Sequence, residues 1–238
     1  MILVNLNIKA VLFDLDGTLT QYNLDYQFAR VEIVEEINNL HLDGIDPNLD
    51  LTINAMLYHL EEKMTRTDFT VLKHQIYGIL KKYELEFAKK VKILPNVQTT
   101  LKNLKDKGLK TAIVTNNCLL AAKETITRFH IDNLINVLVT RDDAFMGKPD
   151  SAIVEKALAR LGINSGDAVF IGDSVVDIIA ARNSNVVSVA IPSGPTSSSD
   201  LLEYTPDYLI NSISELSLLI DTIGTNSYQK DKKTGEQR

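Results

Sequence analysis

A single cysteine, Cys118, stands in this sequence of 238 residues, so the chain can form no internal disulfide and suits a reducing compartment. No apolar stretch approaches the roughly 20 residues that a membrane-spanning helix needs, so we expect no membrane partner. The first nine residues are apolar but are interrupted by Asn5 and Asn7, and they lack a basic segment and a small-residue cleavage site. We therefore expect no signal peptide and a cytoplasmic location.

The sequence also lacks a basic run interleaved with aromatic residues. Its 25 Lys and Arg residues are outnumbered by 31 Asp and Glu residues, for a formal net charge of −6. This balance argues against nucleic acid or an anionic membrane surface as the partner. Hydrophobic residues make up 45% and charged residues 24% of the chain, which is ordinary for a globular protein with a sizeable core. The length fits one large domain, or a core with a smaller insertion.

The most informative stretch is an apolar run, residues 10–13, that leads directly into Asp14, Leu15, Asp16 and Gly17. Short apolar runs bounded by turn residues are typical of buried strands in a parallel sheet. In open α/β sheets the chemistry takes place at the carboxyl ends of such strands. Two acids at this place, next to a glycine that lets the backbone turn away, therefore predict a site.

From about residue 91 onward, strand-like and helix-like segments alternate, and this alternation predicts an α/β fold with a doubly wound parallel sheet. A loop is expected over 193–199, a capping box at 212–215 before a last helix, and a disordered polar tail over 225–238. The other expected strands are residues 111–115, 137–140, 168–171, 186–191 and 208–210, with helices over about 95–108, 119–129, 150–162 and from 174 to about 184.

Residues 20–90 have a different character, because helix-periodic segments follow one another with no strand between them. About 70 residues is far more than one crossover between parallel strands requires, so we expect an inserted all-helical cap domain. The predicted catalytic core is then 1–19 together with 91–224. A turn is expected over 41–47, and the periodic apolar positions are Leu24, Phe28, Val31, Val34, Ile37 and Leu40; Leu51, Ala55, Leu57 and Leu60; and Phe69, Leu72, Ile76, Ile79 and Leu80.

Polar residues follow other expected strands, or lie in the loops beside them. Each is weak evidence alone, because acids and threonines after strands are usually turn or capping residues. Their order along successive strand–helix units of one sheet is more informative. They are Thr115 and Asn116, Lys148 within Gly147-Lys148-Pro149, and Asp173 and Asp177.

Together with Asp14-Leu15-Asp16-Gly17-Thr18, this ordered set resembles the four motifs of the haloacid dehalogenase-like (HAD) superfamily of hydrolases. The resemblance covers about residues 8–220. It implies a Rossmann-like HAD core, and the helical insertion between the first and second motifs looks like the cap of phosphoglycolate phosphatase-like and β-phosphoglucomutase-like members.

The resemblance implies a role for each acid of the first motif. Asp14, ionised at neutral pH, would attack phosphorus and form an aspartyl phosphate. Asp16 would protonate the leaving oxygen and then take a proton from water. The dehalogenases of the superfamily lack an acid at the position of Asp16, so this residue favours phosphoryl transfer.

A cluster of Asp14, Asp16, Asp173 and Asp177 would repel itself strongly without a cation, and oxygen ligands suit Mg²⁺. The resemblance implies that Asp14 and Asp173 bind the metal through carboxylates and Asp16 through its backbone carbonyl. The family varies at Asp177, which is carried over as an alternative or outer ligand. The other interpretation of Asp177 is a first-turn acid that stabilises a helix.

For the phosphate group, the resemblance implies a hydrogen bond from Thr115, a further contact from Asn116, and a positive charge from the catalytic residue Lys148. Cys118 lacks a base partner and is interpreted as a packing residue. The sequence assigns no substrate role within the cap, where the polar candidates are Tyr22, Asn23, Arg30, His59, Lys63, Arg66 and His74.

The sequence therefore predicts a Mg²⁺-dependent phosphatase that acts on a small phosphorylated metabolite. One alternative is a phosphomutase of the β-phosphoglucomutase type, although the basic cap residues of that type are not identified here. A relative that binds phosphate without turnover is a second alternative. A phospho-signalling receiver domain fits less well, since receivers are smaller and uncapped.

Overall fold

The computed structural model describes residues 7–22, 26–39 and 52–225. Its centre is a parallel six-stranded sheet with strand order β3-β2-β1-β4-β5-β6, which confirms the predicted doubly wound α/β fold. The chain builds β2 and β3 on one side of β1 and then crosses to build β4, β5 and β6 on the other. β1 is therefore the switch point, where ligands bind in this class of sheet. The strands are β1 Ala10–Phe13, β2 Lys110–Val114, β3 Val137–Val139, β4 Ala168–Gly172, β5 Val187–Ala190 and β6 Tyr208–Leu209.

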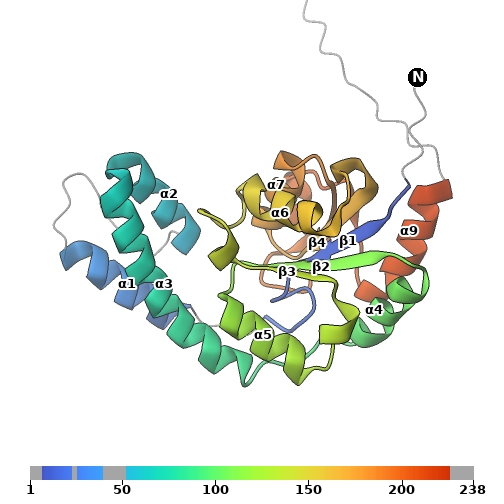
Figure 1. The fold of residues 1–238 in the computed structure, drawn as a ribbon, viewed down its shortest axis with the longest axis horizontal. Coiled ribbons are helices and arrows are strands. Elements are labelled where there is room, and N and C mark those ends of the chain that lie inside the picture. Colours follow the sequence, from blue (N-terminus) through green and yellow to red (C-terminus); the bar gives the residue numbers. More distant parts are fainter. Residues whose placement is uncertain (1–6, 23–25, 40–51, 226–238) are drawn as a thin grey trace, which may run out of the picture.

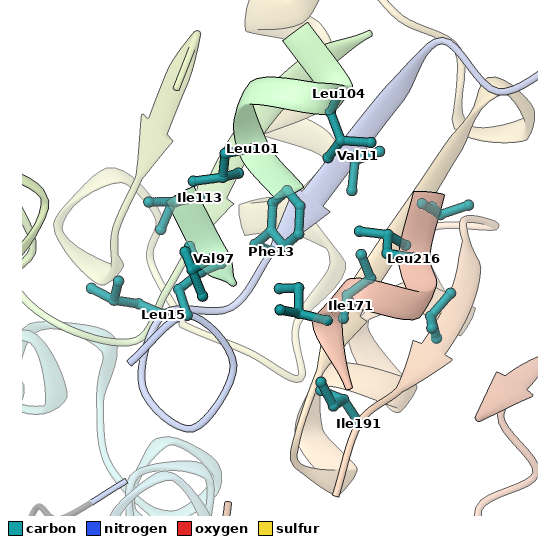
Figure 2. Close-up of a cluster of buried hydrophobic side chains, with 14 of the residues drawn as sticks. Val11, Phe13, Leu15, Val97, Leu101, Leu104, Ile113, Ile171, Ile191 and Leu216 are labelled. Atoms are coloured by element: carbon teal, nitrogen blue, oxygen red, sulfur yellow. The ribbon is translucent and has the colours of Figure 1, made fainter. Parts of the chain in front are cut away.

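One face of the sheet packs against α4 (Val97–Asp106), α5 (Leu119–Arg128) and α9 (Leu216–Thr225). Val11 and Phe13 of β1 point to this side, and Phe13 lies in the middle of the cluster drawn in Figure 2. The predicted buried face of α4 is confirmed by its fully buried leucines and valine.

The opposite face is covered by α6 (Ser151–Leu161) and α7 (Val175–Asn183), as Figure 1 shows. Ala10 and Leu12, the alternate residues of β1, point to this side. The two-residue period of the strand therefore supplies both clusters, and β1 is buried on both faces. Asp150 caps α6, and its carboxylate accepts a hydrogen bond from the Ala152 N–H at 2.8 Å.

Three helices, here called the cap, lie beside the core: α1 (Gln27–Asn39), α2 (Ile53–Lys63) and α3 (Arg66–Ala88) (Figure 1). They bury a cluster of their own. The long α3 extends from this cluster to the core, where it packs against α5. Most of the predicted apolar face of the second and third cap segments is confirmed. Ala55 and Ile79 are half-buried, and the buried residues are Leu57, Leu60, Phe69, Leu72, Ile76 and Leu80.

The predicted face of α1 is only partly right: Ile37 is buried and Val34 packs against the cap cluster, but the two predicted residues nearer the start of the helix are not buried. Phe28 and Val31 are exposed, with 69% and 44% of their surface accessible, whereas Ala29 and Ile33 are buried together with Ile37. Apolar residues occur on more than one side of this helix, so their spacing alone does not identify the side that packs.

Two further differences concern the carboxyl-terminal third. The loop expected over 193–199 ends early, because Ser197 caps an additional helix, α8 (Ser198–Glu203). No reciprocal box forms at 212–215. Instead Ser212 caps a 3₁₀ turn, Ile213–Glu215, that precedes α9.

Several predictions lie outside the described residues: the turn over 41–47, Asn23, Leu24, Leu40, Leu51, the tail from 226, and residues 1–6 of the amino-terminal stretch. Within the described ranges, no helix is both long enough and apolar enough to cross a membrane.

Candidate active site

The acids of the first motif lie where β1 ends, in the centre of the sheet edge. The Asp14 N–H still donates to the Ile171 carbonyl of β4, at 2.9 Å, and the chain then turns at Gly17, whose φ is +85°. A Cβ atom on Gly17 would lie 2.3 Å from Oδ2 of Asp173. A Cβ on Gly194, in the loop after β5, would lie 1.7 Å from the same oxygen. Glycine is therefore required on both sides of the Asp173 carboxylate.

Three predicted metal ligands come together at this edge. Each of Asp14, Asp173 and Asp177 offers one carboxylate oxygen within 4.8 Å of the others, and all three residues are buried. Lys148 lies among them, with Nζ 2.6 Å from Oδ1 of Asp14 and 2.6 Å from Oδ1 of Asp177. Residues that follow β1 and β4, the first turn of α7 and the loop before α6 thus form one buried charge cluster.

The cluster shifts the pKa of three residues, Asp14, Asp173 and Lys148. Burial raises the pKa of Asp14 to about 7, against the lowering effect of Lys148, and Asp177 raises it further. Burial, with the charges of Asp14 and Asp177, raises the pKa of Asp173 to about 8. Burial alone would lower the pKa of Lys148, but its contacts with Asp14 and Asp177 outweigh burial and raise it. Two carboxyl groups that ionise only near neutrality indicate a site that needs another cation.

The hydrogen bonds divide the acids into two types. Asp177 has both oxygens in use, since Oδ1 accepts from Lys148 and Oδ2 accepts from the N–H of Ser174 at 3.1 Å and from its hydroxyl. Among the described residues, Asp173 accepts a hydrogen bond from the Thr18 hydroxyl at 3.0 Å, through Oδ1 alone. Asp177 therefore serves as an anchor for Lys148 and for the start of α7, and Asp173 retains an oxygen for a metal.

Asp16 lies apart from the carboxylate cluster. Its Oδ1 accepts a 3.0 Å hydrogen bond from the Thr20 hydroxyl, and its Oδ2 accepts one of 2.6 Å from the Asn117 side chain. Burial raises the pKa of Asp16 although these two bonds lower it. The structure thus holds this carboxyl group in a fixed orientation and favours its protonated form.

The turn after β2 carries the predicted phosphate ligands. The Thr115 hydroxyl accepts a hydrogen bond from the Asn117 N–H at 3.2 Å. The Asn116 side chain binds the backbone of Lys148 twice, accepting from its N–H at 2.7 Å and donating to its carbonyl at 3.0 Å. Both polar atoms of Asn116 therefore position Lys148. Cys118 is buried beside Ala88 and Ala121, as a packing residue would be, and burial raises its pKa.

A cavity of about 460 Å³ lies between this edge of the core and the cap. Of the polar cap candidates, Tyr22 and Arg30 line it, whereas His59, Lys63, Arg66 and His74 are not among its lining residues. The predicted core residues at its wall are Asp14, Asp16, Thr115, Asn116, Lys148 and Asp173. The cap adds Tyr26, Asn54 and Glu84.

Several residues of the site were missed by the sequence reasoning. Thr18 and Ser174 lie within the recognised motifs, and a hydroxyl next to a buried acid is a signal that could have identified them. Asn117 follows Thr115-Asn116 directly. Asn54 and Glu84 carry no such signal, because they reach the cavity from helices far away in the chain.

Residues 11–191 match the haloacid dehalogenase-like hydrolase family. The chain belongs to this family. The matched range extends from β1 to the end of β5, so it includes every acid of the cluster and the whole cap. The predicted resemblance is thereby confirmed, and the chain is a hydrolase of the HAD type.

Individual relatives agree over nearly the whole length of this hydrolase. It is 28% identical over 215 residues to a phosphoglycolate phosphatase of Colwellia psychrerythraea, covering 87% of this chain and 95% of that protein. It is 29% identical over 224 residues to the pyrophosphatase PpaX of Bacillus pumilus, covering 90% and 96%. A crystal structure of a hydrolase from Pseudomonas syringae superposes with a TM-score of 0.67 at 25% identity, over 91% of this chain and 100% of that one.

Proposed function

We propose that this hydrolase is a Mg²⁺-dependent phosphatase that hydrolyses a small phosphorylated substrate through a phosphoryl group carried on Asp14. The observation that carries the proposal is the contact of Asp14 with Lys148 at the wall of the cavity, next to the acid pair Asp173 and Asp177. Asp14 as the nucleophile, Lys148 as the cation for phosphoryl oxygens and Asp173 as a metal-binding carboxylate would then surround the bound phosphoryl group.

In the first step an ionised Asp14 oxygen attacks phosphorus, and the bond from phosphorus to the leaving oxygen breaks. Asp16 gives its proton to that oxygen, so the product leaves as an alcohol. In the second step water attacks the phosphorus of the aspartyl phosphate, Asp16 takes a proton from the water, and the Asp14 oxygen departs with inorganic phosphate as the product. The raised pKa of Asp16 supports its part as the acid in the first step.

Lys148 and Thr115 are proposed to hold the phosphoryl oxygens during both steps. Lys148 already lies 2.6 Å from the attacking carboxylate, so its charge is placed beside the reaction centre before substrate arrives. Asn116 is proposed to act through the Lys148 backbone, which it binds with both of its polar atoms. Asn116 is thus proposed to position Lys148 in place of the phosphate contact expected from the sequence.

The donor set fits Mg²⁺, which prefers a few carboxylate oxygens and keeps waters and a phosphate oxygen as further ligands. Asp14, Asp173 and the backbone carbonyl of Asp16 would hold the ion, with Asp177 acting through Lys148 and Ser174. When bound, the ion would neutralise the carboxylates and stabilise negative charge on the phosphoryl group. The raised pKa values of Asp14 and Asp173 support this assignment, because like charges so close require a cation.

The leaving group is proposed to be small. The named relatives act on phosphoglycolate and on pyrophosphate, which share a phosphoryl group and differ in what leaves. A cavity of about 460 Å³ must hold the whole substrate, and its cap side carries both Arg30 and Glu84. Phosphorylated small molecules are therefore the substrates to test first.

We also propose that the chain divides into a core of residues 1–19 and 91–224 and a cap of residues 20–90. The two connections run side by side, with Thr20 paired to Ile93 in an antiparallel bridge. The Gln21 N–H donates to the Lys92 carbonyl at 2.8 Å, and the Leu94 N–H donates to the Leu19 carbonyl at 3.0 Å. Two paired connections at one place support a boundary between core and cap there.

Hydrolysis of p-nitrophenyl phosphate and of a panel of phosphorylated small molecules tests the proposal. Wild type should release phosphate with Mg²⁺ and lose this activity in EDTA, and Asp14→Asn should be inactive under both conditions. Asp167→Asn, which changes an acid at the opposite end of the sheet beside Lys9, is the matched control and should behave as wild type. Full activity of Asp14→Asn would refute the mechanism.

A further inference from the structure

The chain between Arg141 and Lys148, here called the 141–148 segment, leaves the core and enters the cap. Met146 is buried in the cap's apolar cluster, and Phe145 packs against the same cluster. The Phe145 ring lies 5.8 Å from the ring of Phe69 on α3, centre to centre. A piece of the core's own chain therefore completes the hydrophobic core of the cap.

Polar contacts from the cap hold the backbone of this segment. Lys73 of α3, nine-tenths buried, donates from Nζ to the Phe145 carbonyl at 2.6 Å and lies 3.8 Å from the centre of the Phe145 ring. Asn54 of α2 donates to the Lys148 carbonyl at 3.0 Å. Lys73 therefore holds Phe145 strongly, because it makes both a charge-assisted hydrogen bond and a cation–π contact with this residue.

The beginning of the segment is held by a buried ion pair. Arg141 pairs with Glu84 of α3, and their side chains are 3% and 1% exposed. Arg141 also donates to the Asn116 carbonyl at 2.8 Å, while Glu84 accepts from the Cys118 N–H at 3.0 Å. The pair thus joins the cap helix to the turn that carries Thr115.

The end of the segment is Lys148, whose Nζ contacts Asp14 and Asp177. We propose that the cap, through Lys73 and Asn54, holds the 141–148 segment and thereby positions Lys148. The position of the cap on the core then sets the geometry of the catalytic residues. This inference rests on the proposed function. It makes Lys73 a positioning residue, because Lys73 does not line the cavity and reaches the site through Phe145.

The test compares Lys73→Met with Lys81→Met, since Lys81 is an exposed lysine on the same helix. Lys73→Met keeps most of the side-chain volume and removes the charge and the donor. We expect kcat to fall about tenfold with KM changed less than twofold, because a misplaced Lys148 weakens the transition state more than it weakens substrate binding. Inhibition by orthovanadate, a mimic of the transferring phosphoryl group, should weaken by a similar factor. Lys73→Arg should recover most of the activity, and Lys81→Met should match wild type.

A second variant keeps the test decisive if Lys73→Met does not fold. Phe145→Leu loosens the same segment within the cap and also leaves the cavity wall unchanged. It should lower kcat and weaken vanadate inhibition together, as Lys73→Met does. A folded variant with a lower Tm but with the kcat and vanadate inhibition of wild type would show that these contacts only stabilise the cap. That result, with wild type active and Asp14→Asn inactive, would overturn this inference and leave the proposed function standing.

Discussion

Lys148 Nζ lies 2.6 Å from Oδ1 of Asp14 and 2.6 Å from Oδ1 of Asp177, and all three residues are buried. A lysine that is 2% exposed needs such partners, since an unpaired buried charge is very costly. Asp177 is itself fixed by Ser174 at the start of α7. The pairing therefore places a permanently charged lysine against the proposed nucleophile.

Replacing this lysine should remove most of the activity. Lys148→Met is expected to lower kcat about 100- to 1000-fold, the usual cost of losing one group that stabilises transition-state charge. The variant also leaves Asp14 and Asp177 facing each other without the cation, so its Tm in EDTA should fall. Steady-state kinetics and thermal unfolding check both effects, with the exposed Lys102→Met as the control. A kcat within threefold of wild type would contradict the role given to Lys148.

Changing the general acid should affect substrates unequally. Asp16→Asn cannot give a proton, so hydrolysis of an alkyl phosphate should fall much more than hydrolysis of p-nitrophenyl phosphate, whose leaving group departs without one. The second step also loses its base, and phosphorylated enzyme should accumulate as a burst of p-nitrophenol before slow turnover. Rapid-mixing kinetics measures the burst. If the rate of hydrolysis falls equally for both substrates and no burst is seen, Asp16 does not transfer the proton.

Stability without metal should depend on pH in a direction set by the acid cluster. Asp14 and Asp173 have folded-state pKa values of about 7 and 8, against an ordinary value of 3.8. The folded protein therefore binds protons more tightly than the unfolded chain. This contribution to stability is full below the unfolded value of 3.8 and is lost as pH rises from there through the folded values of about 7 and 8. In EDTA the Tm should be lower at pH 8.5 than at pH 6.

Magnesium should reverse this loss, because the ion takes the place of the protons. Addition of MgCl₂ should raise the Tm clearly at pH 8.5 and little at pH 5, and Asp173→Asn should show a much smaller response at pH 8.5. An increase in Tm that is the same at all pH values, or that survives in Asp173→Asn, would argue against a metal at these carboxylates.

The structural features that the sequence predicts are local in the chain. The sequence predicts the site at Asp14 and Asp16 because the buried apolar strand and the acids that follow it are neighbours in the chain. The packed side of α1 cannot be predicted from the sequence in the same way. Phe28 and Val31 have the right spacing for a packed face, yet Ala29 and Ile33 are the buried residues. Which side packs depends on the other cap helices and on how they meet.

Contacts between the cap and the core are also beyond the sequence pattern. Glu84 and Arg141 are 57 positions apart, and Asn54 and Lys148 are 94 apart. The spacing of these residues along the chain does not predict their contacts, because the contacts form only when the cap packs against the folded core. Asn116 shows the same limit, because its place in a motif does not reveal that its side chain binds the backbone of Lys148, 32 positions away.

Chemical trapping of the phosphorylated enzyme would show whether Asp14 carries the phosphoryl group. Enzyme quenched during turnover of its substrate and reduced with borohydride should contain homoserine at position 14, since an acyl phosphate is reduced and a free carboxylate is not. Peptide mass spectrometry locates the change, and Asp16→Asn should increase its yield by slowing the second step. Active enzyme that gives no homoserine at position 14, or gives it at another acid, would contradict the account.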